Sequence, residues 1–176
     1  MNDTSEWDVW TDETTNVINW PSLGSYNVNF TKYNIIYQGV FDGNHKTIRC
    51  LYRKNPGYDN QGGLIGYIGR SGALKNLTIE KSYVTACAVF AGFNNGSVTN
   101  CTAGRLRTKY CGHGGAVFVY KNYGIMDACV NTADVEWIDK QRENCFGIVD
   151  MNYGIVKNCV NRGAINNTGG RISGDV

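Results

Sequence analysis

The sequence has only 2 prolines in 176 residues, no long apolar run and few charged residues, 18% in all. A membrane-spanning helix needs about 20 consecutive apolar residues, so we expect no membrane insertion by this segment. The formal net charge of +2 argues against nucleic acid as a partner, because nucleic-acid-binding domains carry a dominant basic patch. Scarce proline with 22 glycines and 42% apolar residues indicates a globular, turn-rich chain of one domain.

The seven cysteines lack the paired Cys-x-x-Cys spacing of zinc ribbons and thioredoxin-like sites, so we expect no metal and no cofactor. Residues 1–16 are acidic and polar, where a secretory signal would carry basic residues followed by an apolar run. If the protein is exported, we expect its signal peptide to lie outside this sequence.

A repeat is present instead. Four segments align on the pattern Gly-x-hydrophobic-x-Asn-Cys and begin at Gly72, Gly96, Gly124 and Gly154. The first has Leu77 in place of Cys, and the third has Ala128 in place of Asn. These anchor glycines are 24, 28 and 30 residues apart, which is the range of solenoid repeats. Each anchor follows a short apolar run, and an alternating segment follows each anchor. Such runs are too short for helices and rich in strand formers, so each coil should hold two or three strands.

The repeat therefore predicts an all-β fold, a right-handed parallel β-helix of about 24–30 residues per coil. Equivalent residues would then stack about 4.8 Å apart along the axis. One predicted interior column contains Leu77, Cys101, Cys129 and Cys159. We interpret these thiols as buried apolar groups, with a disulfide between neighbouring coils or a metal site as the alternative.

Three further columns follow from the same register. Leu74, Val98, Met126 and Val156 form a second interior column. A corner must separate the two interior columns, at the position of Asn76, Asn100 and Asn158, whose side chains can bond backbone groups at a bend. A polar ladder is predicted for Asn94, Asn122 and Asn152, because stacked amides satisfy one another's donors and acceptors. The first coil departs from it, with Arg70 two residues before its anchor glycine.

The two ends differ from the repeat. Residues 1–39 do not join the register and are predicted to form an aromatic-rich capping segment, while residues 40–176 form the coils. Aromatic side chains of this segment would cover the first strand edges. They are Trp7, Trp10, Trp20, Tyr26, Phe30 and Tyr33. Nothing cap-like follows the last coil, so we expect a fragment of a longer protein or a last coil that meets another domain or chain.

With these residues identified, the sequence resembles the GLUG-repeat proteins of bacterial surfaces. Their coils read Gly-Gly-hydrophobic-hydrophobic-Gly, then Asn-x-Gly-x-Ile-x-Asn-Cys. The matching segments are residues 62–66, 94–101 and 152–159, and residues 41–48 resemble the usual lead-in strand. The resemblance covers roughly residues 37–166 and departs at Tyr120 and Ala128 in the third coil. It implies a secreted or cell-surface bacterial setting, in adhesins, in stalks beside proteases or in uncharacterised secreted proteins.

Two candidate ligand-binding groups stand out. Arg105, Arg107 and Lys109 alternate with other residues, so a strand would present three cations on one outward face, suited to sulfated or uronic-acid glycans. The alternative is a solvated face that discourages edge pairing. Tyr123 and Tyr153 share the position before the anchor glycine and would stack, as a sugar platform or by mutual packing.

A carbohydrate-active enzyme is the main rival function, because parallel β-helices also host polysaccharide lyases and hydrolases. Such chemistry needs two carboxylates, or a base beside a cation, and the candidate acids occupy no shared column. They are Asp127, Asp134, Glu136, Asp139 and Asp150. His45, His113 and Cys111 have no recurring partner. We therefore expect no catalytic residues and a non-catalytic module for adhesion, for glycan or surface-protein binding, or for rigid display; a purely structural stalk is the third possibility.

Overall fold

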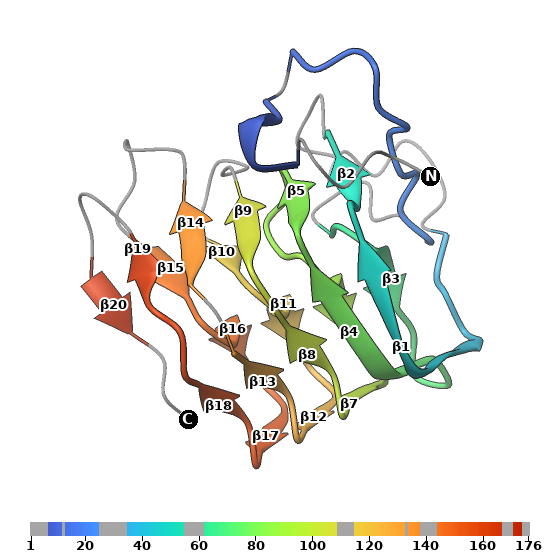
Figure 1. Cartoon of the computed structure of the whole chain (residues 1–176). Helices are drawn as coiled ribbons and strands as arrows, with labels where there is room; N and C mark the ends of the chain where they lie inside the picture. Colours follow the sequence, from blue (N-terminus) through green and yellow to red (C-terminus); the bar gives the residue numbers. More distant parts are fainter. Residues whose placement is uncertain are drawn as a thin grey trace.

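The computed structural model describes residues 7–11, 13–24, 35–54, 62–108, 115–132, 134–137, 144–166 and 171–173. Within these ranges the only helical element is a turn of 3-10 helix, η1 (Trp7–Val9), and the other elements are β-strands. Strands of successive coils pair in parallel and stack side by side (Figure 1). The chain is therefore a parallel β-solenoid, as the repeat predicts. No helix in the described ranges is long and apolar enough to span a bilayer.

Four sheets run along the solenoid axis. The first sheet contains β3 (Ile65–Ile68), β6 (Ala91–Asn94), β11 (Val119–Asn122) and β16 (Val149–Asn152). The second contains β1 (Val40–Arg49), β4 (Ala73–Glu80), β7 (Ser97–Thr99), β12 (Ile125–Asp127) and β17 (Ile155–Lys157), with β8 (Thr102–Ala103), β13 (Val130–Asn131) and β18 (Val160–Asn161) after a corner. The third contains β2 (Tyr52–Arg53), β5 (Ser82–Val84), β9 (Leu106–Thr108), β14 (Val135–Trp137) and β19 (Ile165–Asn166). The fourth contains β10 (Gly115–Ala116), β15 (Asn144–Phe146) and β20 (Arg171–Ser173).

The interior is built from columns of like residues. Leu74 pairs with Val98, Val98 with Met126 and Met126 with Val156, in the register that the repeat predicts. The first three of these side chains are fully buried. Phe90 and Phe118 stack in the same way, with ring centroids 4.6 Å apart. Each coil therefore buries its apolar residues against the corresponding residues of its neighbours, which is how a solenoid acquires one continuous core.

The anchor glycines are required by the distance between coils. A Cβ atom on Gly96 would lie 2.1 Å from the carbonyl oxygen of Gly72, and one on Gly124 would lie 2.2 Å from that of Gly96. The same approach recurs at Gly154. A side chain at these positions would push the coils apart, so the strongest signal in the sequence marks a close backbone contact between successive coils.

The corner after each anchor adopts the left-handed backbone region. Its residues are Asn76, Asn100, Ala128 and Asn158, with φ of 55°, 51°, 53° and 54°. Asn visits this region more easily than other non-glycine residues. The sequence led us to expect amides bonding backbone groups here, whereas Asn100 Nδ2 donates to Asn76 Oδ1 at 2.8 Å. The asparagines of this corner are thus explained first by backbone conformation.

The N-terminal segment is closer to the repeat than its sequence indicates. The backbone amides of Trp20, Leu23 and Tyr37 donate to the carbonyl oxygens of Tyr52, Leu64 and Tyr67, respectively. Parts of residues 19–37 therefore extend the first and third sheets by backbone pairing. Backbone pairing needs no particular side chains, which is why no repeat marks it. Of the predicted capping aromatics, Tyr26, Phe30 and Tyr33 lie outside the described residues.

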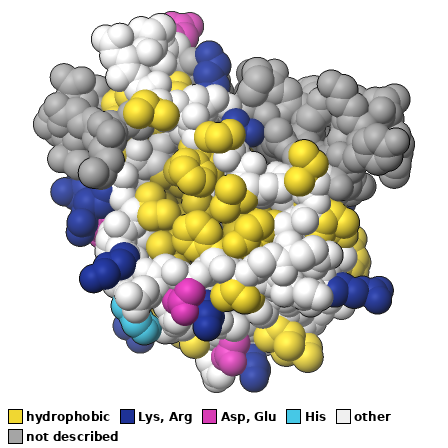
Figure 2. Space-filling view, turned by 90° about the vertical axis from the view of Figure 1, so that its right-hand side faces the viewer, with side chains coloured by type: hydrophobic (Ala, Val, Ile, Leu, Met, Phe, Trp, Pro, Cys, Tyr) yellow, Lys and Arg dark blue, Asp and Glu magenta, His cyan; other side chains and the backbone are white. Residues whose placement is uncertain are grey.

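Hydrophobic side chains are visible at the first-coil end of the solenoid. Figure 2 views the molecule from this end and shows them gathered at the centre of the face, with Lys, Arg, Asp and Glu side chains toward its rim. Ile18, Ile35 and Val40, which are 67%, 65% and 59% exposed, belong to the segments at this end. Exposed apolar side chains at this end thus belong to the capping segment and to the start of β1.

Ala128→Asn should stabilise the protein, because Ala128 holds a left-handed conformation that costs an L-residue about 1–2 kcal/mol and that Asn tolerates. Ala128 is exposed, so the larger side chain meets no packed core. We expect a gain of about 1 kcal/mol, or roughly 2–4 °C in Tm by calorimetry. The reciprocal control, Asn100→Ala, should lose a similar amount. An unchanged or lowered Tm for Ala128→Asn would contradict this account of the corner.

Candidate functional site

The cysteine column lies inside the solenoid. Leu77, Cys101, Cys129 and Cys159 are buried, and the three cysteines are free thiols. The hydrogen bond with Cys101, together with burial, raises the pKa of Cys129 to about 12. The hydrogen bond with Cys129 and burial raise the pKa of Cys159 as well. The hydrogen bond with Cys129 lowers the pKa of Cys101, whose side chain is fully buried. Because the thiolate is the nucleophile and metal ligand, the raised pKa of Cys129 and Cys159 and the burial of all three side chains make them poor candidates for chemistry.

The predicted asparagine ladder forms one continuous chain of hydrogen bonds. Asn94 Nδ2 donates to Asn122 Oδ1 at 2.7 Å, and Asn122 Nδ2 donates to Asn152 Oδ1 at 2.8 Å. Asn94 and Asn122 are fully buried, and only Asn152 is exposed. The amides satisfy one another in the core, where an unpaired polar group costs roughly 1–3 kcal/mol. The ladder therefore has a structural role.

The predicted cationic face is partly covered by the chain itself. The Arg107 guanidinium donates to the backbone carbonyl oxygens of Asp8 and Trp10. The Arg105 guanidinium carbon lies 5.3 Å from the centroid of the Trp7 ring, a cation–π contact. Lys109 lies outside the described residues. Two of the three predicted ligand-binding cations are therefore held by η1 and its neighbours, a contact between segments almost 100 residues apart that no local pattern reveals.

Tyr123 and Tyr153 stack, as predicted from their shared position before the anchor glycine. Their ring centroids are 4.9 Å apart with an interplanar angle of 13°. The two residues are 50% and 64% exposed. The mutual packing and the exposed aromatic surface are thus both present, and neither interpretation of the pair excludes the other.

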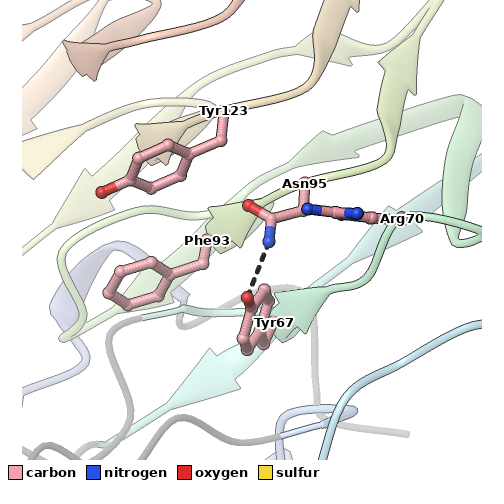
Figure 3. A pocket seen from close by; sticks show the side chains of 5 residues that line it. All are labelled: Tyr67, Arg70, Phe93, Asn95 and Tyr123. Atoms are coloured by element: carbon pink, nitrogen blue, oxygen red, sulfur yellow. Dashed lines mark hydrogen bonds between the residues drawn. The ribbon is translucent and has the colours of Figure 1, made fainter.

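A pocket of about 370 Å³ opens beside Tyr123. We call it the corner pocket, because it lies at the bend before the anchor glycines rather than at the left-handed corner after them. It is lined by Tyr67, Arg70, Phe93, Asn95 and Tyr123 (Figure 3). Tyr67 lies on β3 and Phe93 on β6, and Tyr123 follows β11, so three successive coils contribute an aromatic ring. Asn95 Nδ2 donates to the Tyr67 hydroxyl at 2.7 Å. The pocket thus combines aromatic surface with a few placed polar groups, as small-molecule sites do.

Sequence reasoning missed most of this pocket. Arg70 stood out only because it interrupts the asparagine column, and Tyr67 and Phe93 belong to apolar runs that indicate interior strands. The register counted from the anchor glycines did not bring these rings together, because the turn before Gly72 is two residues longer than the turn before Gly96. In the structure Ile68, not Arg70, pairs with Asn94, and Tyr67 pairs with Phe93.

Within the described part of the chain, the candidate acids do not lie together in one site. Asp127 pairs with Lys157 at 3.2 Å, and Asp134 accepts the Ala164 amide at 2.8 Å. Burial raises the pKa of Asp150 to about 6, against the opposing charge of Lys121. The side chains of Glu136 and Asp139 lie outside the described set, as do His113 and Cys111. His45 is exposed on β1.

Among the described residues, no group of three or more His, Cys, Asp or Glu side chains is placed to hold a metal ion. Cys87, which is buried beside Phe93 and Tyr120, is disulfide-bonded. Cys87 thus belongs to a different cluster of buried residues from the cysteine column.

Known protein families and solved structures yield no match. A stretch of 70 residues is 40% identical to halomucin from Haloquadratum walsbyi strain DSM 16790 / HBSQ001. The match covers 38% of this chain and 1% of halomucin, so the chain spans only a small fraction of that protein.

The column thiols should resist alkylation in the folded protein, because they are buried and the pKa of Cys129 is about 12. We expect iodoacetamide to leave Cys101, Cys129 and Cys159 unmodified under native conditions and to label all three in guanidinium. Cys87 should be labelled only after reduction, and peptide mass spectrometry resolves each site. Labelling of the column thiols under native conditions would contradict their burial, and labelling of Cys87 without reductant would contradict its disulfide bond.

Asp150→Asn should stabilise the protein more at pH 7.5 than at pH 4. The folded pKa of about 6 exceeds the ordinary 3.8, so the penalty for the ionised carboxyl is absent below pH 4 and grows as the pH rises through 6. Discounted for partial exposure, we expect about 1 kcal/mol, or roughly 2–4 °C in Tm. Lys121→Met should enlarge the loss in the protein that retains Asp150. An equal Tm difference between Asp150→Asn and wild type at both pH values would refute the raised pKa of Asp150.

Proposed function

We propose that this chain is a non-catalytic, secreted or cell-surface β-solenoid module that binds a glycan at the corner pocket. The observation that carries the proposal is the row of rings from three coils, with Arg70 and Asn95 beside them. A pyranose ring has an apolar face of C–H groups that packs on aromatic rings, and hydroxyls that need hydrogen-bond partners. The pocket offers both kinds of contact on the outside of the coil.

The extracellular setting has two supports. Disulfides persist in oxidising compartments and are rare in the cytosol, and Cys87 is disulfide-bonded. The partial match to halomucin is to a protein named as a mucin, a class found outside cells. The two observations agree.

The solenoid also suits display. Its coils are joined by backbone pairing, interior columns and the asparagine ladder, so the outer surface is held on a continuous scaffold. Of the pocket's lining residues, Tyr67 and Phe93 lie on strands, and Asn95 and Tyr123 directly follow strands. Side chains on or next to regular strands are held more accurately than side chains in long loops. In this proposal the repeat supplies rigidity, and the corner pocket supplies recognition.

Removal of the exposed ring of Tyr123 should weaken glycan binding. The whole chain is first screened on a glycan array, and the best oligosaccharide is then titrated by calorimetry against wild type and Tyr123→Ala. Loss of ring stacking, about 0.5–1.5 kcal/mol, predicts a roughly three- to tenfold weaker affinity. Ile155→Ala, which removes an exposed apolar side chain from the neighbouring β17, should bind as wild type does.

Each other outcome has a definite meaning. If no glycan binds at micromolar concentration, the chain is better explained as a spacer or as a protein-binding module. If the oligosaccharide is shortened or acquires a double bond during the titration, the enzyme alternative replaces the proposal. If Ile155→Ala weakens binding as much as Tyr123→Ala does, the site lies elsewhere on this side of the solenoid.

A further inference from the structure

We infer that the corner pocket selects a glycan that bears carboxylates, such as a polyuronate, and that Arg70 binds the carboxylate. The inference rests on the proposed glycan-binding function and adds the class of ligand. The sequence predicts recognition of acidic glycans by Arg105, Arg107 and Lys109. We assign this role to Arg70 instead, a residue that differs from the asparagines of the other coils.

Arg70 lies in an insertion. Two residues, Asn95 and Gly96, connect Asn94 to β7, whereas four residues, 69–72, connect the equivalent Ile68 to β4. Two backbone hydrogen bonds hold this longer turn. The Gly69 amide donates to the Tyr37 carbonyl oxygen, and the Gly72 amide donates to the Gly69 carbonyl oxygen. An ordered turn of this kind places a long side chain at the mouth of the pocket with a smaller loss of conformational entropy on binding.

The Arg70 guanidinium is available for a ligand. Arg70 is exposed, and it has no hydrogen-bond or ion-pair partner within the described ranges. Arginine presents donors in a planar fork that matches a carboxylate in a bidentate manner. None of the lining residues is acidic, so nothing in the pocket wall competes for this cation.

The other charges near the aromatic surface do not replace Arg70. Lys121 Nζ lies 5.7 Å from the centroid of the Phe93 ring and 5.3 Å from that of Tyr120. Lys121 also interacts electrostatically with Asp150, one coil further along. The charges of these two groups offset each other, which leaves Arg70 as the uncompensated cation of the pocket.

The remaining wall suits the sugar ring. Asn95 uses its Nδ2 on the Tyr67 hydroxyl, and its Oδ1 points toward the space between Phe93 and Tyr123 (Figure 3). An oxygen in this position can accept a hydrogen bond from a sugar hydroxyl. The Tyr123 ring continues into the stacked Tyr153 one coil further, so the aromatic surface follows the solenoid axis away from Arg70. A chain of sugars can therefore extend along the coils with one carboxylate at Arg70.

The test compares two oligomers of equal length, a hexamer of galacturonic acid and the same hexamer with methyl-esterified carboxyl groups. Esterification removes the charge and keeps the ring. The whole chain and its Arg70→Gln variant are titrated with both by calorimetry. We expect wild type to bind the acid at least tenfold more tightly than the ester, and Arg70→Gln to bind the two alike. Arg162→Gln, an exposed arginine after β18, is the matched control and should bind as wild type does.

The outcomes separate this inference from the proposed function. Equal binding of acid and ester by wild type overturns the inference and leaves glycan binding standing. An acid preference that survives in Arg70→Gln, or that is lost equally in Arg162→Gln, also overturns it, because the charge would then act from elsewhere or non-specifically. Failure of wild type to bind any glycan, on the array or in the titrations, overturns both. A thermal melt of each variant verifies that the solenoid remains folded.

Discussion

Each coil approaches the coil before it most closely at the anchor glycine, where a Cβ atom would lie 2.1 or 2.2 Å from the carbonyl oxygen one coil earlier. This contact fixes the distance and the register between coils. Once register is fixed, each residue of a paired strand has the equivalent residue of the next coil as its neighbour. Buried apolar columns, the asparagine ladder and the left-handed corner all follow from that condition.

The interior was predictable because its constraints recur. The apolar column of Leu74, Val98 and Met126, the anchor glycines and the corner after them are visible in the sequence because the same requirement acts on each coil. The same constraint acts where the residue type differs, because Ala128 stands where asparagine is usual and adopts nearly the same φ as the corner asparagines of the other coils. A requirement that appears once, such as the cover of Arg107 by residues near the N-terminus, leaves no pattern of this kind.

The exterior was less predictable for a related reason. Outward positions need not repeat, so their chemistry is set one coil at a time, and neighbours across coils come from residues 24–30 apart. Tyr67, Phe93 and Tyr123 form one surface only when three coils are stacked. Arg70 joins them from an insertion, which is where solenoids commonly place binding residues. Candidate sites in such folds are therefore best sought where a coil departs from its repeat.

The asparagine ladder also gives the solenoid a direction. Each amide donates to the amide of the following coil, so Asn94 and then Asn122 point their donors the same way along the axis. Aligned hydrogen bonds polarise one another, and each added member strengthens those before it. A folded coil therefore presents an oriented donor to the segment that has not yet folded. A chain that emerges from the ribosome or a secretion channel N-terminus first would meet these donors in order, so the ladder can guide coil-by-coil growth as a vectorial template.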